Sequence, residues 1–230
     1  MLTDLQFTFP GISTSIELLP EKAAFLVQSS TLLIADPHFG KATHFRKAGI
    51  PIPEQIFQKD LDVLEQLILR KQPKNLIVLG DFFHSDHNPE WEAFLQWKQK
   101  FPSVNWKIVV GNHDRKMLPR LMQNDLVLSG AHSSPEGIYF NHEPDYSGKP
   151  NVCGHIHPGY TLKGAGRQKI SLPCFFLHQS CLILPAFGAF TGLAPVKPMS
   201  GDRVLSLILT KSLKFRLEYY HSFHIFTNST

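Results

Sequence analysis

The sequence is poor in cysteine and contains no long apolar run. Its three cysteines, Cys153, Cys174 and Cys181, form no CxxC pair, and an odd number cannot all pair within one chain. A disulfide framework is therefore not expected, and a reducing compartment is favoured. Apolar runs such as TLLIA and CLILPAF fall far short of the roughly 18 residues that a membrane helix needs. The N-terminal residues also lack the pattern of a secretory signal, so we expect a cytoplasmic protein without membrane contact.

Charge is also modest. Charged residues make up 18% of the chain and the net charge is +4, which excludes a polycationic protein that coats nucleic acid. With 230 residues, of which 43% are hydrophobic, the chain can bury a sizeable core, and we expect one domain over residues 1–230. Histidine is unusually frequent: there are twelve, and half of them lie in the short motifs described below.

Short apolar runs alternate with helical stretches in the first half of the chain. The runs are rich in Leu, Ile and Val and lack polar alternation, which predicts buried strands at residues 31–35, 75–79 and 107–110. Apolar residues at helical spacing predict helices at residues 53–71, 89–101 and 117–123, of which the first two open with a proline. Strand and helix in alternation indicate an α/β sheet with helical crossovers.

The second half of the chain has few helical windows. Strand-like runs follow one another at residues 137–141, 151–153, 174–177, 181–184, 204–210 and 213–220. We therefore expect a second, more antiparallel sheet that packs against the first.

Five of the strand-like runs end at residues of the kind that bind metal ions. These residues are Asp36 and His38, Asp81, Asn112, His142, and His155 with His157. Because ligands bind beyond the carboxyl ends of strands in α/β sheets, we expect the five loops to form one site. A single DxH motif, or a single histidine on a strand, is more often structural than functional. Five such motifs in this order favour a metal site.

The local spacing agrees with a metal site. Glycine precedes Asp81, Asn112 and His155, and it allows the tight turn and close backbone approach that a metal cage requires. In the DxH and HxH motifs, one intervening residue would let two side chains leave an extended segment on the same side. Carboxylate, imidazole and amide ligands without thiolate indicate Mn, with Fe or Zn as alternatives, and not a structural zinc site.

The same motifs resemble the ordered signature of the calcineurin-like metallophosphoesterases, which is DxH, GD, GNHD, a later histidine and GHxH. The resemblance implies an α/β sandwich of two mixed β-sheets flanked by helices, and two divalent metal ions. Carried over by motif, one ion would be bound by Asp36, His38, Asp81 and His157. The other would be bound by Asp81, Asn112, His142 and His155, so that Asp81 bridges the two.

Further stretches are similar to a narrower group, the ligase-associated DNA damage response endonucleases. They are DPHFGKATHFRKAGIPIP at residues 36–53, GDFFHS at 80–85 and LPAFGAFTG at 184–192. In one departure, Pro37 stands where a bulky aliphatic residue is expected. Because proline biases the preceding residue toward an extended conformation, we expect Asp36 to be extended, as suits a ligand at a strand end.

The resemblance also implies a mechanism. Two cations about 3.5–4 Å apart can bind a phosphoryl group and lower the pKa of a shared water. A metal-bridging hydroxide is then expected to attack phosphorus in line with the leaving oxygen. His113 is not among the carried-over ligands, so we expect it to protonate the leaving alkoxide or stabilise the transition state, with Asp114 orienting its ring.

Other residues near the motifs have two interpretations each. His84 could orient a ligand or approach substrate, but a capping or solvent-facing role explains it equally well. Arg46, expected in a loop with His44, and Arg115 could contact substrate phosphate, although an ordinary solvated surface also explains them. The aromatic segment 185–191 could stack on bases, but a place in the core is favoured.

These observations favour a metal-dependent phosphodiesterase. The narrower resemblance implies that it cleaves DNA, in a repair pathway with an ATP-dependent DNA ligase and a helicase as partners. One alternative is a phosphodiesterase or phosphatase that acts on a small nucleotide or another phosphate ester. A second alternative is a non-catalytic interaction scaffold. The presence of His113 and of every carried-over ligand argues against the scaffold.

Overall fold

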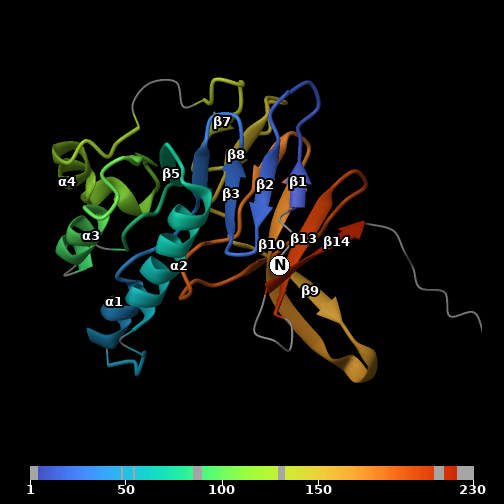
Figure 1. Ribbon diagram of the computed structural model, residues 1–230. Helices are drawn as coiled ribbons and strands as arrows, with labels where there is room; N and C mark the ends of the chain where they lie inside the picture. Colours follow the sequence, from blue (N-terminus) through green and yellow to red (C-terminus); the bar gives the residue numbers. More distant parts are fainter. Residues whose placement is uncertain are drawn as a thin grey trace, which may run out of the picture.

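Two β-sheets packed face to face form the centre of the structure, and helices cover the outer face of the first sheet (Figure 1). The computed structural model describes residues 5–47, 49–53, 55–84, 90–128, 133–209 and 215–221. The predicted α/β architecture of two mixed sheets flanked by helices is confirmed.

The first sheet contains β1 to β6 in sequence order. Its parallel half consists of the three predicted strands, β4 (Thr31–Ile34), β5 (Asn75–Leu79) and β6 (Asn105–Val109). Its antiparallel half consists of β1 (Leu5–Phe7), β2 (Ile16–Leu19) and β3 (Ala23–Leu26), which the sequence pattern did not predict. These strands have only three or four residues each, so the apolar runs are too short to show a period.

Helical crossovers connect the parallel strands, as predicted. They are α2 (Ile56–Lys71) and α3 (Glu90–Lys98), followed after β6 by the 3-10 helix η1 (His113–Lys116) and α4 (Leu118–Gln123). The helix predicted from Pro53 begins at Ile56, and Pro89 lies outside the described residues. Within the described part of the chain, no helix combines the length and the apolar character needed to cross a bilayer.

The segment after the first metal motif was expected to be a loop, and this prediction is wrong. It forms α1 (Lys41–Lys47), so His44 and Arg46 lie on a helix. Only Ala42 is buried among the described side chains of this helix, while His44 is exposed. A helix without an apolar face shows no periodicity in the sequence, which explains the error.

The second sheet is mixed, with an order of β12-β9-β10-β11-β8-β7; in addition, β13 pairs with β10, and β14 pairs with β13. Its strands are β7 (Tyr139–Phe140), β8 (Asn151–Cys153), β9 (Pro158–Lys163), β10 (Lys169–His178), β11 (Cys181–Ile183), β12 (Ala194–Pro195), β13 (Arg203–Leu209) and β14 (Phe215–His221). Each predicted strand region contains a strand, but residues 210, 213 and 214 lie outside the described part. No sequence pattern predicted β9, whose residues are mostly polar, glycine or proline.

The core has two layers, because the central strands are buried on both faces. In β4, Leu32 and Ile34 pack with α2 and α3, whereas Leu33 packs against the second sheet. In β5, Val78 faces the helices and Leu79 faces the second sheet. Continuous apolar strands of this kind are typical of a covered parallel sheet. They hold both sheets in fixed positions beneath the loops that follow the strands.

A loop between β11 and β12, residues 185–191, is tied to the turn between β2 and β3 and to helix α2. Lys22 donates a hydrogen bond from Nζ to the Gly188 carbonyl at 3.2 Å, and Asp60 on α2 accepts from the Ala189 N–H at 3.1 Å. Burial lowers the pKa of Lys22 to about 8 and raises the pKa of Asp60 to about 6. In the same loop Phe187 is buried in the core, as favoured, while Phe190 is half-buried.

Replacing Asp60 with Asn should reveal this buried carboxyl as a pH-dependent contribution to stability. The pKa of Asp60 is about 6 in the folded protein and 3.8 in the unfolded chain, so the folded state binds the proton more tightly. This contribution is complete below pH 3.8 and is lost as the pH rises through about 6. Relative to Asp60→Asn, the wild type should therefore gain about 1 kcal/mol of unfolding free energy between pH 7 and pH 5 in denaturant titrations.

The matched control is Asp62→Asn, on the exposed side of the same helix. Its stability is measured over the same pH range. If the Asp60→Asn difference from the wild type varied with pH no more than the Asp62→Asn difference, the burial of Asp60 would be contradicted.

Candidate metal centre

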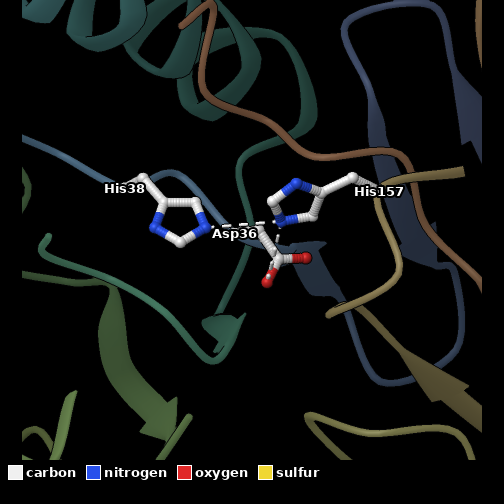
Figure 2. Close-up of side chains that lie close together, drawn as sticks. All are labelled: Asp36, His38 and His157. Atoms are coloured by element: carbon white, nitrogen blue, oxygen red, sulfur yellow. Dashed lines mark hydrogen bonds and ion pairs between the residues drawn. The ribbon is translucent and has the colours of Figure 1, made fainter. Parts of the chain in front are cut away.

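A first cluster consists of Asp36, His38 and His157, which come from the loops after β4 and β8 (Figure 2). Nε2 of His157 lies 3.6 Å from Oδ1 of Asp36 and 3.3 Å from Nε2 of His38. Asp36 is fully buried and His38 nearly so. Three donor atoms from two sheets therefore converge at one point, although 119 residues separate His38 from His157.

A second cluster consists of Asp81, His142 and His155, which follow β5, β7 and β8. Nε2 of His142 lies 3.6 Å from Oδ1 of Asp81 and 3.1 Å from Nδ1 of His155. The other ring nitrogen of His142 lies 3.0 Å from the Leu79 carbonyl. A hydrogen bond to that carbonyl would place the proton on Nδ1 and leave the Nε2 lone pair directed at the cluster.

Asp81 connects the two clusters. Its Oδ2 lies 3.7 Å from Nε2 of His38 in the first cluster, while its Oδ1 faces His142 in the second. The carboxylate thus stands between two sets of imidazoles, where a bridging ligand would have to stand.

The backbone at these positions is strained. Asp36, His38, Asp81, His155 and His157 have φ values of 48°, 45°, 49°, 67° and 51°. Such left-handed conformations are uncommon for residues other than glycine and cost on the order of 1–3 kcal/mol each. The prediction that Pro37 holds Asp36 in an extended conformation is therefore wrong. The two side chains of each motif are brought together by left-handed turns and not by the alternation of an extended strand.

Main-chain amides hold the two carboxylates in place. The His155 N–H donates to Oδ2 of Asp36 at 2.8 Å, and the His113 N–H donates to Oδ1 of Asp81 at 2.9 Å. Oδ1 of Asp36 is buried without a hydrogen-bond partner. A buried carboxylate oxygen in that state is unfavourable unless a cation accompanies it. The site therefore fits a divalent metal ion.

Three glycines let the loops approach closely, as the sequence predicted. A Cβ added to Gly80 would lie 2.1 Å from Nδ1 of His142, and one added to Gly111 would lie 2.4 Å from Oδ1 of Asp81. A Cβ on Gly154 would lie 2.3 Å from Oδ2 of Asp36. Each space that a side chain would fill is occupied by a candidate ligand.

Electrostatics keeps His38 available as a ligand. Burial, and then the neighbouring His157, lowers the pKa of His38 to about 2. Its imidazole is therefore neutral near neutral pH, and a metal ion meets a lone pair instead of a proton.

Asn112 and His113 lie at the exposed side of the clusters. The side-chain amide of Asn112 donates to Oε1 of Glu143 at 3.2 Å. Sequence reasoning missed Glu143, whose only signal is that it directly follows His142. Nε2 of His113 lies 4.0 Å from Oδ2 of Asp81, and the His113 side chain is 48% exposed. His113 thus reaches both the buried carboxylate and the open side of the site.

Asp114 was expected to orient the ring of His113, and the described hydrogen bonds give it a different role. Its Oδ1 accepts from the Phe82 N–H at 2.8 Å, and its Oδ2 accepts from the Gly111 N–H at 2.9 Å. The carboxylate therefore ties the loop after β5 to the loop after β6. It positions His113 through the backbone and not through its ring.

The remaining candidates lie around the rim. The ring of His84 stacks on that of His113 at 5.5 Å, and its pKa is lowered by burial and then by His113 and His44. The guanidinium of Arg46 donates to the Pro53 carbonyl at 2.9 Å, and Arg46 lines a small pocket together with His38. Arg115 is exposed on η1. The structure thus brings His84 into contact with His113, while Arg46 is partly engaged within the chain.

Comparison with known families decides the identity of the fold. The sequence pattern of the calcineurin-like phosphoesterases matches residues 29–179, which include every member of both clusters. The chain belongs to the calcineurin-like phosphoesterase family. It is therefore a metal-dependent phosphoesterase, and divalent metal ions are the cofactors of this family.

Among solved structures, a nuclease MPE from Pseudomonas putida is similar to this phosphoesterase over nearly its whole length. The two share 28% sequence identity with a TM-score of 0.74, and the match covers 89% of this chain and 96% of that one. Vps29 from Chaetomium thermophilum covers 83% of this chain and 93% of its own. At 10% identity and a TM-score of 0.37, that likeness is too weak to support an inference. A comparison with curated protein sequences finds no match.

Replacing Gly154 with Ala should weaken metal binding. The new Cβ would clash with the Asp36 carboxylate at 2.3 Å and with the Ala35 Cβ at 2.7 Å, so the Asp36 carboxylate must shift from its position in the site. We expect the apparent affinity for Mn²⁺, measured by calorimetric titration, to fall at least about tenfold, as for other changes just behind the ligands.

Gly192→Ala serves as the control, because a Cβ there would meet no atom within 4 Å. If Gly154→Ala bound Mn²⁺ as well as this control, the close approach at Asp36 would not be needed for the site.

Proposed function

We propose that this phosphoesterase is a nuclease that hydrolyses phosphodiester bonds of DNA with two divalent metal ions, preferentially Mn²⁺. The observation that supports this most is the position of Asp81 between two clusters of histidines. The similar nuclease from Pseudomonas putida supports the choice of a nucleic acid substrate.

Seven residues would hold the ions. One ion would be bound by Asp36, His38, Asp81 and His157, and the other by Asp81, Asn112, His142 and His155. Because the Nδ2 of Asn112 donates to Glu143, its carbonyl oxygen is left to act as the ligand. When bound, the ions would act as Lewis acids toward the phosphate and lower the pKa of a shared water.

His113 would act on the leaving group. Its ring is held between those of His84, at 5.5 Å, and His38, at 5.2 Å, while the main-chain N–H of His113 donates to Oδ1 of Asp81. This arrangement keeps the ring at the open side of the site, within reach of a phosphate at the clusters. A protonated His113 could transfer a proton to the departing alkoxide.

The pathway is proposed on resemblance alone. The stretches at residues 36–53, 80–85 and 184–192 favour a cytoplasmic enzyme of DNA repair that acts with an ATP-dependent DNA ligase and a helicase. Copurification of such a ligase with the tagged chain would support this assignment. If no ligase copurifies or binds, the assignment fails and the proposed chemistry is unaffected.

The function is tested by supplying Mn²⁺ with bis-p-nitrophenyl phosphate, single-stranded DNA and duplex DNA in parallel. Both the diester and DNA should be hydrolysed, and neither should be hydrolysed by a metal-stripped sample or by Asp81→Ala. Hydrolysis of the diester without DNA would indicate a phosphodiesterase for small substrates. Loss of both reactions despite bound metal would indicate a non-catalytic scaffold.

Replacing His113 with Ala should depress DNA cleavage by roughly 10²–10⁴-fold, the contribution of a general acid. Hydrolysis of bis-p-nitrophenyl phosphate should fall much less, because its weakly basic leaving group needs little protonation. Steady-state kinetics on both substrates would measure the difference.

Metal content measured by elemental analysis should remain at the wild-type level in His113→Ala. The control is Lys116→Ala, which is exposed on the same short helix. Loss of metal from the His113 variant would mean that His113 is a ligand and not an acid.

A further inference from the structure

A hairpin leaves the second sheet directly after the candidate ligand His157. It consists of β9, the turn at η2 (Ala165–Arg167) and the first half of β10, and we call residues 158–173 the arm. Figure 1 shows the arm extending away from both sheets. The part of the arm beyond Gly159 adds little to the core, since its tip residues are exposed.

The tip of the arm is positively charged. Lys163, Arg167 and Lys169 are exposed, and the sequence of the arm contains no Asp or Glu. None of the three cations forms an ion pair with a residue that the structure describes. Lys163 and Lys169 are also directly opposite each other in the hairpin. Like charges in that position destabilise a strand pair, so folding alone gives no reason for them.

The two faces of the arm differ in character. The face that carries Lys163 and Lys169 also carries Thr161 and Ser171, whose hydroxyl oxygens lie 2.8 Å apart. Lysines and hydroxyls are the groups that proteins use to bind phosphate oxygens of a nucleic acid backbone. The opposite face carries apolar residues, including Ile170, which is 57% exposed.

The base of the arm is fixed to the metal centre. The Ala194 N–H donates to the His157 carbonyl at 2.9 Å, and the Val196 N–H donates to the Gly159 carbonyl at 2.9 Å. Gly159 packs so closely on Leu193 that an added Cβ would lie 2.8 Å from the Cβ of that residue. Residues 193–196 therefore hold the base of the arm directly beside His157.

The length of the arm matches a short stretch of nucleic acid. Lys163 lies six residues beyond His157, and a strand rises about 3.3 Å per residue, which gives a reach of about 20 Å. Measured along the axis of a duplex, successive phosphates of one strand are about 3.4 Å apart, so an arm of this reach that lies parallel to the axis spans about six nucleotides.

We propose that the arm binds the phosphate backbone of the nucleic acid strand whose scissile phosphate lies at the metal centre, about six nucleotides from the cut. This inference rests on the proposed nuclease function and extends it. It explains how a chain with a net charge of only +4 could hold a polyanion, since the cations would be concentrated where the strand passes.

The test replaces Lys163, Arg167 and Lys169 together with Ala. Binding of the wild type and the variant to fluorescein-labelled DNA of about 20 nucleotides, single-stranded and duplex, would be measured by anisotropy in chelator, without cleavage. We expect about tenfold weaker binding and a slope of log affinity against log salt that is smaller by about 2, since each phosphate contact contributes about 0.7–0.9. Hydrolysis of bis-p-nitrophenyl phosphate, which is too short to reach the arm, should match that of the wild type.

The control variant replaces Lys59, Lys74 and Lys98 with Ala, which removes the same charge from α2, α3 and the loop between α2 and β5. If both variants lost DNA affinity equally, net charge alone would explain binding and the inference would fail. The inference would also fail if the arm variant bound DNA like the wild type. If that variant also lost binding to vesicles of anionic lipid, the arm would be a membrane-binding element instead. If the wild type bound DNA through the arm but cleaved no DNA, the result would support the arm as a nucleic acid binding element and would refute the proposed nuclease reaction.

Discussion

The site is arranged around two carboxylates that water cannot solvate. Asp36 is fully buried and Asp81 is 3% exposed, so their charges must be compensated by the protein or by bound cations. Each carboxylate accepts one main-chain N–H from a distant loop, which fixes its orientation but does not neutralise it. Among the imidazoles around them, His38 is neutral near neutral pH, because burial lowers its pKa to about 2. A pair of divalent ions would neutralise the two carboxylates and would be bound by the surrounding imidazole nitrogens.

This constraint explains why the surrounding backbone is strained. The left-handed turns at residues such as Asp36 and His155 place the side chains where no extended strand could place them. The strained conformations persist because contacts with neighbouring segments hold the loops in place. Gly188 packs on the Pro37 carbonyl, where a Cβ would approach to 2.2 Å, and the loop that contains Gly188 is in turn tied to Lys22 and Asp60. Strain near the metal centre is thus supported by contacts well away from it.

The sequence predicted the parallel strands, the crossover helices and the loops that carry Asp36, Asp81 and His155, because continuous apolar runs and glycine-bounded polar motifs are local signals. It also predicted the close approach at Gly154. Whether these residues bind metal stays a prediction. The arm and α1 were not predicted, since neither has a buried face that would leave a period in the sequence.

Contacts between distant segments were also out of reach. The role of Asp114 depends on the amides of Phe82 and Gly111, and the ties from Lys22 and Asp60 depend on a loop more than a hundred residues away. The error at Asp36 had a physical cause. The preference of a residue before proline is a local bias, and here the burial and anchoring of the carboxylate outweigh it.

The proposed ligands are divided between the two sheets, and this division has a consequence for how the chain assembles. Asp36, His38 and Asp81 belong to loops of the first sheet, whereas His142, His155 and His157 belong to loops of the second. Neither sheet alone offers a complete coordination sphere, so tight binding of the metal ions requires that the two sheets have docked. Once bound, the ions would link loops of the two sheets. Metal binding would then be the last step of folding, and it would stabilise the docked arrangement of the sheets.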